Sequence, residues 1–373
     1  MRYYIIAGEA SGDLHASNLM KELKSQDPDA FFRCWGGDMM QKQGAELVKH
    51  YRDLAFMGFI EVASHLPTIL KNFHLCEGDL VAFNPDVIIL VDYPGFNLRM
   101  ARFAARKGIR VFYYISPQLW AWRSSRVKSV RKWVEKMFVI LPFEKEFYAR
   151  YNYNVDYVGH PLLDVINGQM HLKNRHQFLL QNELSDKKII ALMPGSRKME
   201  IEKMLGIMTS VITSFPDYQF VIAGAPSVPG DFYDRILKGT SVKLVIDQTY
   251  DLLSHSCAAL VASGTATLET ALMEIPQVVC YKGNRLSYLI AKLLVNVSYI
   301  SLVNLISGKM LVPELIQSEL NRENLVKALS EILENSAERK SMIDGYHLLK
   351  QELGGSGASA RAASLMIQYL KQK

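Results

Sequence analysis

The segment 260–281, LVASGTATLETALMEIPQVVCY, constrains the fold of this chain more than any other stretch. It predicts a buried strand over 259–262, a tight turn at 263–265, a helix over 266–274 that ends before Pro276, and a second strand over 277–281. This order is one parallel βαβ unit, so the sequence predicts an α/β fold.

The turn of this unit has the composition of a phosphate site. Ser263 and Thr265 can cap the helix, and Gly264 lets the backbone approach a ligand closely. Glu269 lies about one turn further along, where its carboxylate could accept hydrogen bonds from a ribose diol. An ordinary crossover with a surface glutamate explains the same residues, so both interpretations stand at this point.

Size and composition limit the class of protein. A chain of 373 residues exceeds what one hydrophobic core usually supports, so two domains are expected. The net charge of +6 favours an anionic substrate or an acidic membrane surface and does not require nucleic acid. The cysteines lack the spacing of a zinc site or a disulfide framework, which indicates a reducing compartment. A strand begins at Arg2 and no apolar run reaches the roughly 18–20 residues of a transmembrane helix, so we expect a cytoplasmic protein, soluble or peripheral.

The loop after the first predicted strand, residues 2–7, offers polar groups to a ligand. Its sequence, GEASGD, is not the GxGxxG of a dinucleotide site, which weakens an NAD-binding interpretation. Glu9 and Ser11 follow the carboxyl end of the strand, where open α/β sheets bind ligands. Asp13 could be no more than a helix cap.

A single acid follows another buried strand. In PDVIILVDYPGFN, Asp92 ends the apolar run and should lie on the ligand side of a parallel sheet. Capping of its own turn is the alternative role for this carboxylate.

A cation in PGSRKMEIEKML occupies an unusual position. The pattern places Arg197 in the first turn of a helix, where a positive charge opposes the helix dipole. The guanidinium could hold a diphosphate there, and the alternative is an ion pair with Glu200 or Glu202.

Two stretches combine apolar or aromatic side chains with basic ones. Residues 54–75, with Phe59 and Ile69 among many apolar side chains, predict either a core helix pair or a surface that faces a membrane or an acyl chain. Residues 116–136 interleave tryptophans with basic residues that include Arg123 and Arg126. Such a stretch could bind nucleic acid, but no recognised nucleic-acid fold accompanies it, and its basic residues could form only a solvated face.

Short motifs along the chain resemble those of one family. They are GEASGD at 8–13, FMGFIEV at 56–62, VDYPGFN at 91–97, YISPQLWAWR at 114–123, LPFEKEFY at 141–148, VGHPLLD at 158–164, PGSR at 194–197, ASGTATLE at 262–269 and SLVNLI at 301–306. Together they resemble the bacterial lipid-A-disaccharide synthase family, whose enzymes have the two-domain GT-B glycosyltransferase fold. Each motif alone is weak, but the set covers nearly the whole chain in order.

The resemblance implies two Rossmann-like domains that face a cleft. The first, residues 1–166, would bind the acceptor and face the membrane, and the second, residues 187–353, would bind the UDP-sugar donor. Residues 167–187 would link them, and a last helix over 358–373 would pack on the first domain or on a partner subunit of a homodimer.

It also implies an inverting transfer from UDP-2,3-diacylglucosamine to 2,3-diacylglucosamine 1-phosphate, at the inner face of the cytoplasmic membrane and with no nucleic acid. Asp92 would be the general base, since the matching Asp of the family is the candidate for that role. Gly95 stands where some relatives have a second acid, so Asp92 is the only acid in the motif. Glu9 and Asn304 would position sugar or phosphate groups, although Asn304 could merely cap a short helix. Arg197 and the 263–265 turn would stabilise the leaving diphosphate. The basic stretch with Arg123 and Arg126 would bind the acceptor's phosphate or an anionic lipid headgroup. No DxD motif follows a suitable strand, so neither a metal nor a cofactor is expected.

Two other functions remain open on the sequence. One is a different GT-B enzyme, either a UDP-sugar 2-epimerase or a transferase with a soluble acceptor, against which the apolar 54–75 segment argues. The other is a non-catalytic lipid- or nucleotide-binding protein, against which the joint presence of Asp92, Arg197 and Glu269 argues.

Overall fold

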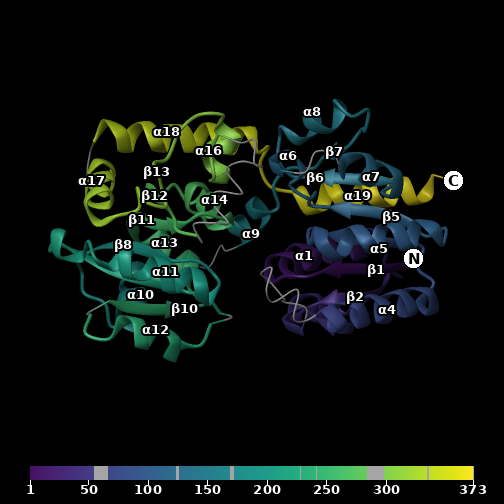
Figure 1. Cartoon of the computed structure of the whole chain (residues 1–373), viewed down its shortest axis with the longest axis horizontal. Coiled ribbons are helices and arrows are strands. Elements are labelled where there is room, and N and C mark those ends of the chain that lie inside the picture. The colour runs from purple at the N-terminus through teal and green to yellow at the C-terminus, as the bar shows by residue number, and fades with distance from the viewer. Residues whose placement is uncertain are drawn as a thin grey trace. The chain divides into compact units, whose positions relative to one another are not determined.

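The computed structural model describes residues 1–53, 66–122, 126–168, 172–226, 228–240, 242–283, 298–333 and 336–372. The chain divides into two compact units (Figure 1). Unit 1 comprises Met1–Asp164 and Gly355–Lys373, and unit 2 comprises Val165–Gly354.

Unit 1 is built on a parallel sheet. The order of its described strands is β3-β2-β1-β4-β5-β6-β7, with β1 Arg2–Ala7, β2 Phe31–Gly36, β3 Glu46–His50, β4 Val87–Val91, β5 Arg110–Tyr114, β6 Lys136–Val139 and β7 Asp156–Tyr157. Its helices are α1 Ala10–Gln26, α2 Asp38–Lys42, α4 Leu66–Phe83, α5 Pro94–Arg106, α6 Leu119–Trp122, α7 Val127–Trp133, α8 Glu144–Ala149, α9 Leu162–Gly168, which runs on into unit 2, and α19 Ala358–Lys371, with a 3-10 turn at Tyr51–Asp53.

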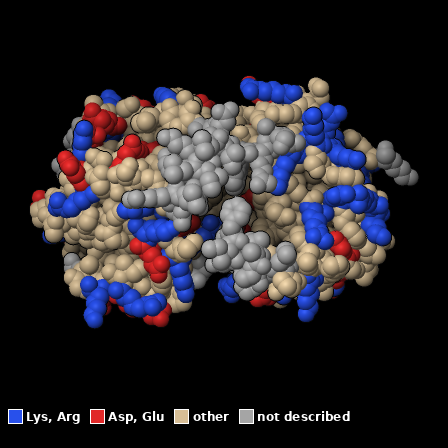
Figure 2. Space-filling view, in the orientation of Figure 1, with Lys and Arg blue, Asp and Glu red and all other residues tan. Residues whose placement is uncertain are grey.

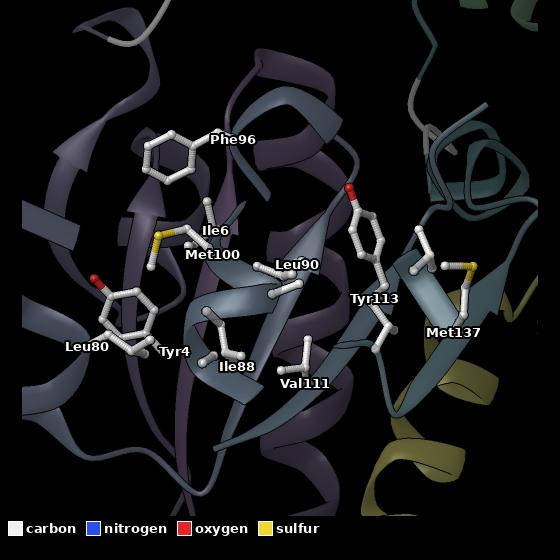
Figure 3. Packing of buried hydrophobic residues seen from close by; sticks show 14 of the residues in the cluster. Tyr4, Ile6, Leu80, Ile88, Leu90, Phe96, Met100, Val111, Tyr113 and Met137 are labelled. Atoms are coloured by element: carbon white, nitrogen blue, oxygen red, sulfur yellow. The ribbon is translucent and has the colours of Figure 1, made fainter. Parts of the chain in front are cut away.

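Both faces of this sheet are buried, which is why its central strands are continuous apolar runs rather than alternating ones. Successive residues of β1 and β4 point to opposite faces and enter two different cores. Tyr4, Ile88 and Tyr113 pack beneath α4, α5 and α7 (Figure 3), whereas Tyr3 and Ile89 pack on the opposite face beneath α1 and α19.

The C-terminal helix α19 belongs to unit 1. It packs along α1, and its apolar face, which includes Ala362 and Met366, is buried in the same core as Leu19 and Leu23. Asp164 caps its start by accepting hydrogen bonds from the backbone N–H groups of residues 357, 358 and 359.

Unit 2 repeats the architecture. The strand order is β10-β9-β8-β11-β12-β13, with β8 Lys188–Met193, β9 Tyr218–Gly224, β10 Lys243–Ile246, β11 Ser256–Ala262, β12 Gln277–Tyr281 and β13 Glu314–Ile316. Its helices are α10 Arg175–Gln181, α11 Lys198–Thr209, α12 Gly230–Leu237, α13 Thr249–Ser254, α14 Thr265–Leu272, α16 Leu302–Ser307, α17 Arg322–Ile332 and α18 Ala337–Glu352, with a 3-10 turn at Ile212–Ser214.

The expected linker at 167–187 is wrong for its described part. Helix α10 lies within it, and Phe178 is fully buried in the core of unit 2. Lys173 N–H donates to the carboxylate of Asp251 over 2.9 Å, which ties the start of this stretch to α13. Polar composition favours a linker here, but the buried ring of Phe178 and the bond from Lys173 hold the described part of the segment in unit 2.

The strand order creates a topological switch point in each unit. In unit 1, β1 lies between β2 and β4, so the connections after β1 and β4 leave toward opposite faces of the sheet. In unit 2 the corresponding neighbours are β8 and β11. Open α/β sheets bind ligands in the crevice at the carboxyl ends of such strands.

Candidate active site

The switch point of unit 1 brings the loop after β1 against the turn after β4. Ala7 and Val91 are register partners, so Gly8 and Asp92 both begin at the same edge of the sheet. A Cβ atom at position 8 would lie 2.3 Å from the ring of Tyr93, so only glycine lets these two segments pack this closely. The predicted placement of Glu9 and Asp92 at one edge therefore has a structural basis.

The turn itself is strained. Asp92 and Tyr93 have φ angles of 45° and 48°, both in the left-handed region. For residues other than glycine such a conformation costs about 1–3 kcal/mol each and persists only where surrounding contacts impose it. Strain of this kind clusters at functional sites.

The carboxyl group of Asp92 has an altered proton affinity. Its pKa is raised to about 6, chiefly by burial and also by the nearby negative charge of Glu9, while a hydrogen bond from the backbone of Tyr93 acts in the opposite direction. A carboxylate whose pKa lies nearer to neutrality is a better proton acceptor than an ordinary one.

The other polar residues of the first loop have different roles. Ser11 is exposed in the first turn of α1. Asp13 is buried and accepts hydrogen bonds from the backbone N–H groups of Gly37, Met39 and Met40. Asp13 therefore does not cap its own helix, as the alternative proposed, but accepts hydrogen bonds from backbone N–H groups at the start of α2.

Glu144 is a buried acid that sequence reasoning did not select. It accepts hydrogen bonds from the hydroxyl of Ser116 and from the backbone N–H groups of Ile140 and Leu141. Burial raises its pKa to about 7. These bonds join the loop after β5 to the loop after β6, and of these two strands β5 is the direct neighbour of β4. The only sequence signal was that Glu144 lies in LPFEKEFY and Ser116 in YISPQLWAWR.

In unit 2, the turn after β11 lies beside the loop after β8. Gly264 is the N-cap of α14, and no side chain caps this helix. The hydroxyl of Ser263 donates instead to the carbonyl oxygen of Ile300 over 3.1 Å, and Thr265 is the first helical residue. The predicted capping by Ser263 and Thr265 is therefore wrong. Gly264 and Thr265 are exposed.

Arg197 precedes α11 instead of lying in its first turn. It occupies the N-cap position, and its guanidinium is 3.5 Å from the carboxylate of Glu200. The same carboxylate accepts a hydrogen bond from the backbone N–H of Ser196 over 3.3 Å. The ion pair with Glu200 that the sequence left open is present, while the Arg197 side chain remains half-exposed.

Glu269 lies in the second turn of α14. Burial raises the pKa of Glu269 to about 7. The pKa of Tyr250 is raised mainly by its own burial and additionally by the negative charge of Glu269. A carboxylate that is partly withdrawn from water gains from any ligand that donates hydrogen bonds to it.

Asn304 has a structural role rather than the predicted direct contact with the donor. Its side chain is fully buried within α16, whose cap is Ser301. The amide nitrogen donates to Val312 O and to Glu314, at 2.9 and 2.8 Å. The amide oxygen accepts from the N–H groups of Leu311 and Val312, at 2.8 and 2.9 Å. These bonds tie α16 to the segment that leads into β13.

Two of the predicted membrane or acceptor residues, Phe59 and Arg123, lie outside the described residues. Ile69 is half-buried in α4 and packs against the core of unit 1, so it belongs in part to that core. Arg126 is exposed at the start of α7.

Across the described parts of the chain, no cluster of His, Cys, Asp and Glu side chains has the composition of a metal site. The same residues contain no helix that is long and apolar enough to cross a bilayer.

Comparison with known proteins identifies relatives over the whole length. A family model described as lipid-A-disaccharide synthetase matches residues 3–367. The lipid-A-disaccharide synthase of Syntrophus aciditrophicus is 40% identical over 376 residues, which cover 99% of this chain and 97% of that protein. The enzyme of the same name from Geobacter sulfurreducens is 36% identical, with 99% and 97% covered.

Solved structures share the fold at low identity. The S. aureus MnaA structure with UDP has a TM-score of 0.69 at 14% identity, covering 100% of this chain and 97% of that one. The UDP-GlcNAc 2-epimerase from Neisseria meningitidis bound to UDP-GlcNAc has a TM-score of 0.66 at 13% identity, with both chains covered completely. These likenesses concern the fold alone and confirm the expected GT-B class. The epimerase alternative thus has support from the fold only, whereas the family model and the full-length relatives are described as lipid-A-disaccharide synthases.

Proposed function

The chain belongs to the lipid-A-disaccharide synthetase family, and from that premise we propose that it transfers the sugar of UDP-2,3-diacylglucosamine to 2,3-diacylglucosamine 1-phosphate. The 6-hydroxyl of the acceptor attacks C1 of the donor sugar as the bond from C1 to the UDP oxygen breaks. The products are a β-1,6-linked disaccharide 1-phosphate and UDP. The hydroxyl proton passes to the base, and the departing diphosphate carries the negative charge.

Asp92 is the proposed base. The observation that supports it is its position at the switch point of unit 1, in a strained turn beside Glu9, with a pKa raised to about 6. Glu9, in this proposal, keeps Asp92 basic and positions the acceptor. Ser11 lies on the same loop and offers a hydroxyl to the acceptor.

The donor is assigned to unit 2. The loops after β8 and β11 are neighbours, which places Arg197 and the turn at 263–265 at the same sheet edge. Arg197 would exchange part of its contact with Glu200 for the diphosphate, because phosphate oxygens are strong acceptors for a guanidinium fork. Glu269 would accept hydrogen bonds from the ribose hydroxyls.

Release of UDP tests the function. UDP should form when the purified protein meets both lipid sugars and should not form with either one alone. A 2-epimerase would convert the UDP-sugar without any acceptor, so that outcome would replace the proposed function. Asp92→Asn should lower kcat by a factor of about 10²–10⁴ while the affinity for both substrates changes little. An Asp92→Asn variant with nearly full activity would remove Asp92 from the mechanism.

We also propose peripheral contact with an anionic membrane surface through unit 1. Leu70, Leu75 and Val81 are 40%, 47% and 48% exposed along α4. Lys and Arg side chains gather on the visible face of this unit (Figure 2), and the cationic groups of Arg106 and Lys132 lie within 5.6 and 4.8 Å of the Trp133 ring centre. Exposed apolar side chains and basic groups around an indole ring are both features that suit a membrane–water boundary.

Vesicle sedimentation tests this contact. Binding to anionic vesicles should weaken as salt rises, and Leu70→Asp combined with Leu75→Asp should reduce it further, because both side chains are exposed rather than part of the core. Equal recovery of wild type and double variant would contradict the assignment. A homodimer stays a prediction to be tested by sedimentation velocity, and it would need a surface other than α19, whose apolar face packs in unit 1.

A further inference from the structure

We propose that Asn97 and Tyr113 are positioning residues, which hold the backbone of Asp92 and thereby fix where its carboxylate lies. Neither side chain would touch a substrate. This inference rests on the proposed function, because its importance for the reaction depends on Asp92 being the base. Neither residue was selected from the sequence as part of the site.

Both side chains donate to one carbonyl oxygen. The amide nitrogen of Asn97 lies 2.7 Å from Asp92 O, and the hydroxyl of Tyr113 lies 2.5 Å from the same atom. The two donors come from different elements, α5 and β5, and both side chains are fully buried. Tyr113 rises from β5 with its hydroxyl directed toward the end of the sheet where Phe96 lies (Figure 3).

The Asn97 amide serves a wider junction. Its nitrogen also lies 3.2 Å from Val91 O and 3.4 Å from Ile6 O, the carbonyl groups near the ends of β4 and β1. Only a donor can face three carbonyl oxygens, so this arrangement determines the orientation of the amide and excludes a carboxylate at the same place. The backbone N–H of Asn97 meanwhile donates to Tyr93 O over 3.0 Å. One residue therefore bonds to both carbonyl groups of the strained turn.

The turn needs such support because two consecutive left-handed residues leave the regular ladder of the sheet. The N–H of Asp92 still bonds to Tyr114 O over 3.1 Å, but its carbonyl oxygen is turned to these two side chains. An unpaired buried carbonyl would favour a return to ordinary backbone angles, and the carboxylate would move with it. Asn97 and Tyr113 oppose that relaxation from two sides.

Relaxation should also change the proton affinity of Asp92. Among the described residues, Glu9 in the first loop acts on the carboxyl group of Asp92 through its negative charge, and the pKa of Tyr113 on β5 is raised first by burial and then by the charge of Asp92. Burial is the main reason that the pKa of Asp92 is raised, and Tyr113 is neutral in the working pH range, so its removal acts through geometry. A relaxed turn exposes the carboxylate to water, so the pKa of Asp92 should fall toward its ordinary value.

The test compares two tyrosine variants. Tyr113→Phe removes the donor to Asp92 O and keeps the ring. Tyr153→Phe makes the same change at another buried tyrosine, whose hydroxyl donates over 3.0 Å to Val134 O, near the opposite edge of the sheet. Each loses one buried hydrogen bond, so a purely structural role predicts similar melting temperatures and unchanged catalysis for both variants.

We expect Tyr113→Phe to lower kcat about 10- to 100-fold with KM nearly unchanged, because small misplacement of a catalytic group has effects of that size. The acid limb of its pH–rate profile should move to lower pH, and Tyr153→Phe should keep the wild-type kcat and profile. If both variants retain wild-type kcat and the same acid limb, the inference is overturned. Asn97→Asp, which puts acceptor oxygens toward the three carbonyl groups, should be still less active if it folds.

A readout independent of activity separates this inference from the proposed function. The Asp92 carboxyl carbon can be titrated by NMR in protein with ¹³C-labelled aspartate and assigned by its loss in Asp92→Asn. A lower pKa of Asp92 in Tyr113→Phe, but not in Tyr153→Phe, supports the positioning role even if Asp92→Asn proves active. An unchanged titration in Tyr113→Phe overturns it even if Asp92→Asn proves inactive.

Discussion

The ring of Tyr93 packs against Gly8 so closely that a Cβ atom at position 8 would come within 2.3 Å of it. Through this contact the loop after β1 sets the position of the turn after β4, and with it the position of Asp92. The two residues are 85 positions apart in the sequence, and the local sequence around either one does not predict the contact.

Gly8→Ala should therefore disturb the site more than its size suggests. The added methyl group must push the Tyr93 ring aside, which typically costs about 1–3 kcal/mol of folding free energy and displaces Asp92. We expect a large loss of kcat in the folded protein. Gly95→Ala is the matched control, because a Cβ at position 95 meets nothing within 4 Å. Similar kinetics for the two variants would contradict the coupling of Gly8 to the site.

Activity should fall on acidification because Asp92 must be unprotonated to accept a proton. With a pKa raised to about 6, kcat/KM should decline as pH drops below that value. Glu9→Gln removes a negative charge that raises this pKa, so the decline should shift to lower pH. A pH–rate profile of the free enzyme measures both. A shift to higher pH in Glu9→Gln would show that Glu9 acts on Asp92 in another way.

Substitution can distinguish the roles of Arg197 and Glu200 in UDP binding. Arg197→Ala should weaken UDP binding about 10- to 100-fold, because it removes a charged donor to the diphosphate. Glu200→Gln removes the competing carboxylate 3.5 Å away and should leave UDP affinity unchanged or increase it. Calorimetric titration with UDP distinguishes these outcomes. Equal weakening by both substitutions would indicate that the ion pair shapes the loop instead of competing with the ligand.

Glu269 should make UDP binding pH-dependent. Because burial raises its pKa to about 7, the acid becomes protonated below that pH and loses acceptor capacity for the ribose. UDP affinity should weaken as pH falls in the wild type, and Glu269→Gln should bind more weakly with a flatter dependence over the same range. The same steep dependence in the variant would assign the titration to another group, such as the phosphate itself.

Asn304 should contribute to stability more than to substrate affinity. Asn304→Ala leaves several buried donors and acceptors near Val312 and Glu314 without partners and should cost about 2–4 kcal/mol of unfolding free energy. The folded variant should keep most of its UDP affinity. Asn324→Ala, at a partly exposed site on α17, is the control and should cost much less. Lost UDP affinity with unchanged stability would restore the direct role predicted from the sequence.

The ends of the buried strands could be predicted from the sequence alone. The sequence predicts strands over 2–7 and 277–281, which are the bounds of β1 and β12. Parallel strands covered on both faces are unbroken apolar runs, and polar or glycine residues mark where they end. The same rule located Asp92 directly after an apolar run, at the ligand edge of a sheet.

Helix caps and linkers were less predictable, because several residues can make the same local bond. Ser263 could cap α14 but bonds to Ile300 O, 37 residues away. The polar stretch at 167–187 is held to unit 2 largely by Phe178, whose burial depends on partners in β8, β9 and β11. Local composition does not predict which distant residue a side chain bonds to or packs against in the folded chain.

The sequence by itself determined the fold class, the family and the edges of the sheets where ligand-binding residues lie, because those depend on local apolar patterning and on motifs that stand in a recognisable order. Only the tertiary structure decided how the residues at those edges are held. Asn97 meets Ile6 across 91 positions, and Tyr113 meets Asp92 across 21. Such bonds follow from the order and register of parallel strands, which no local stretch of the chain encodes.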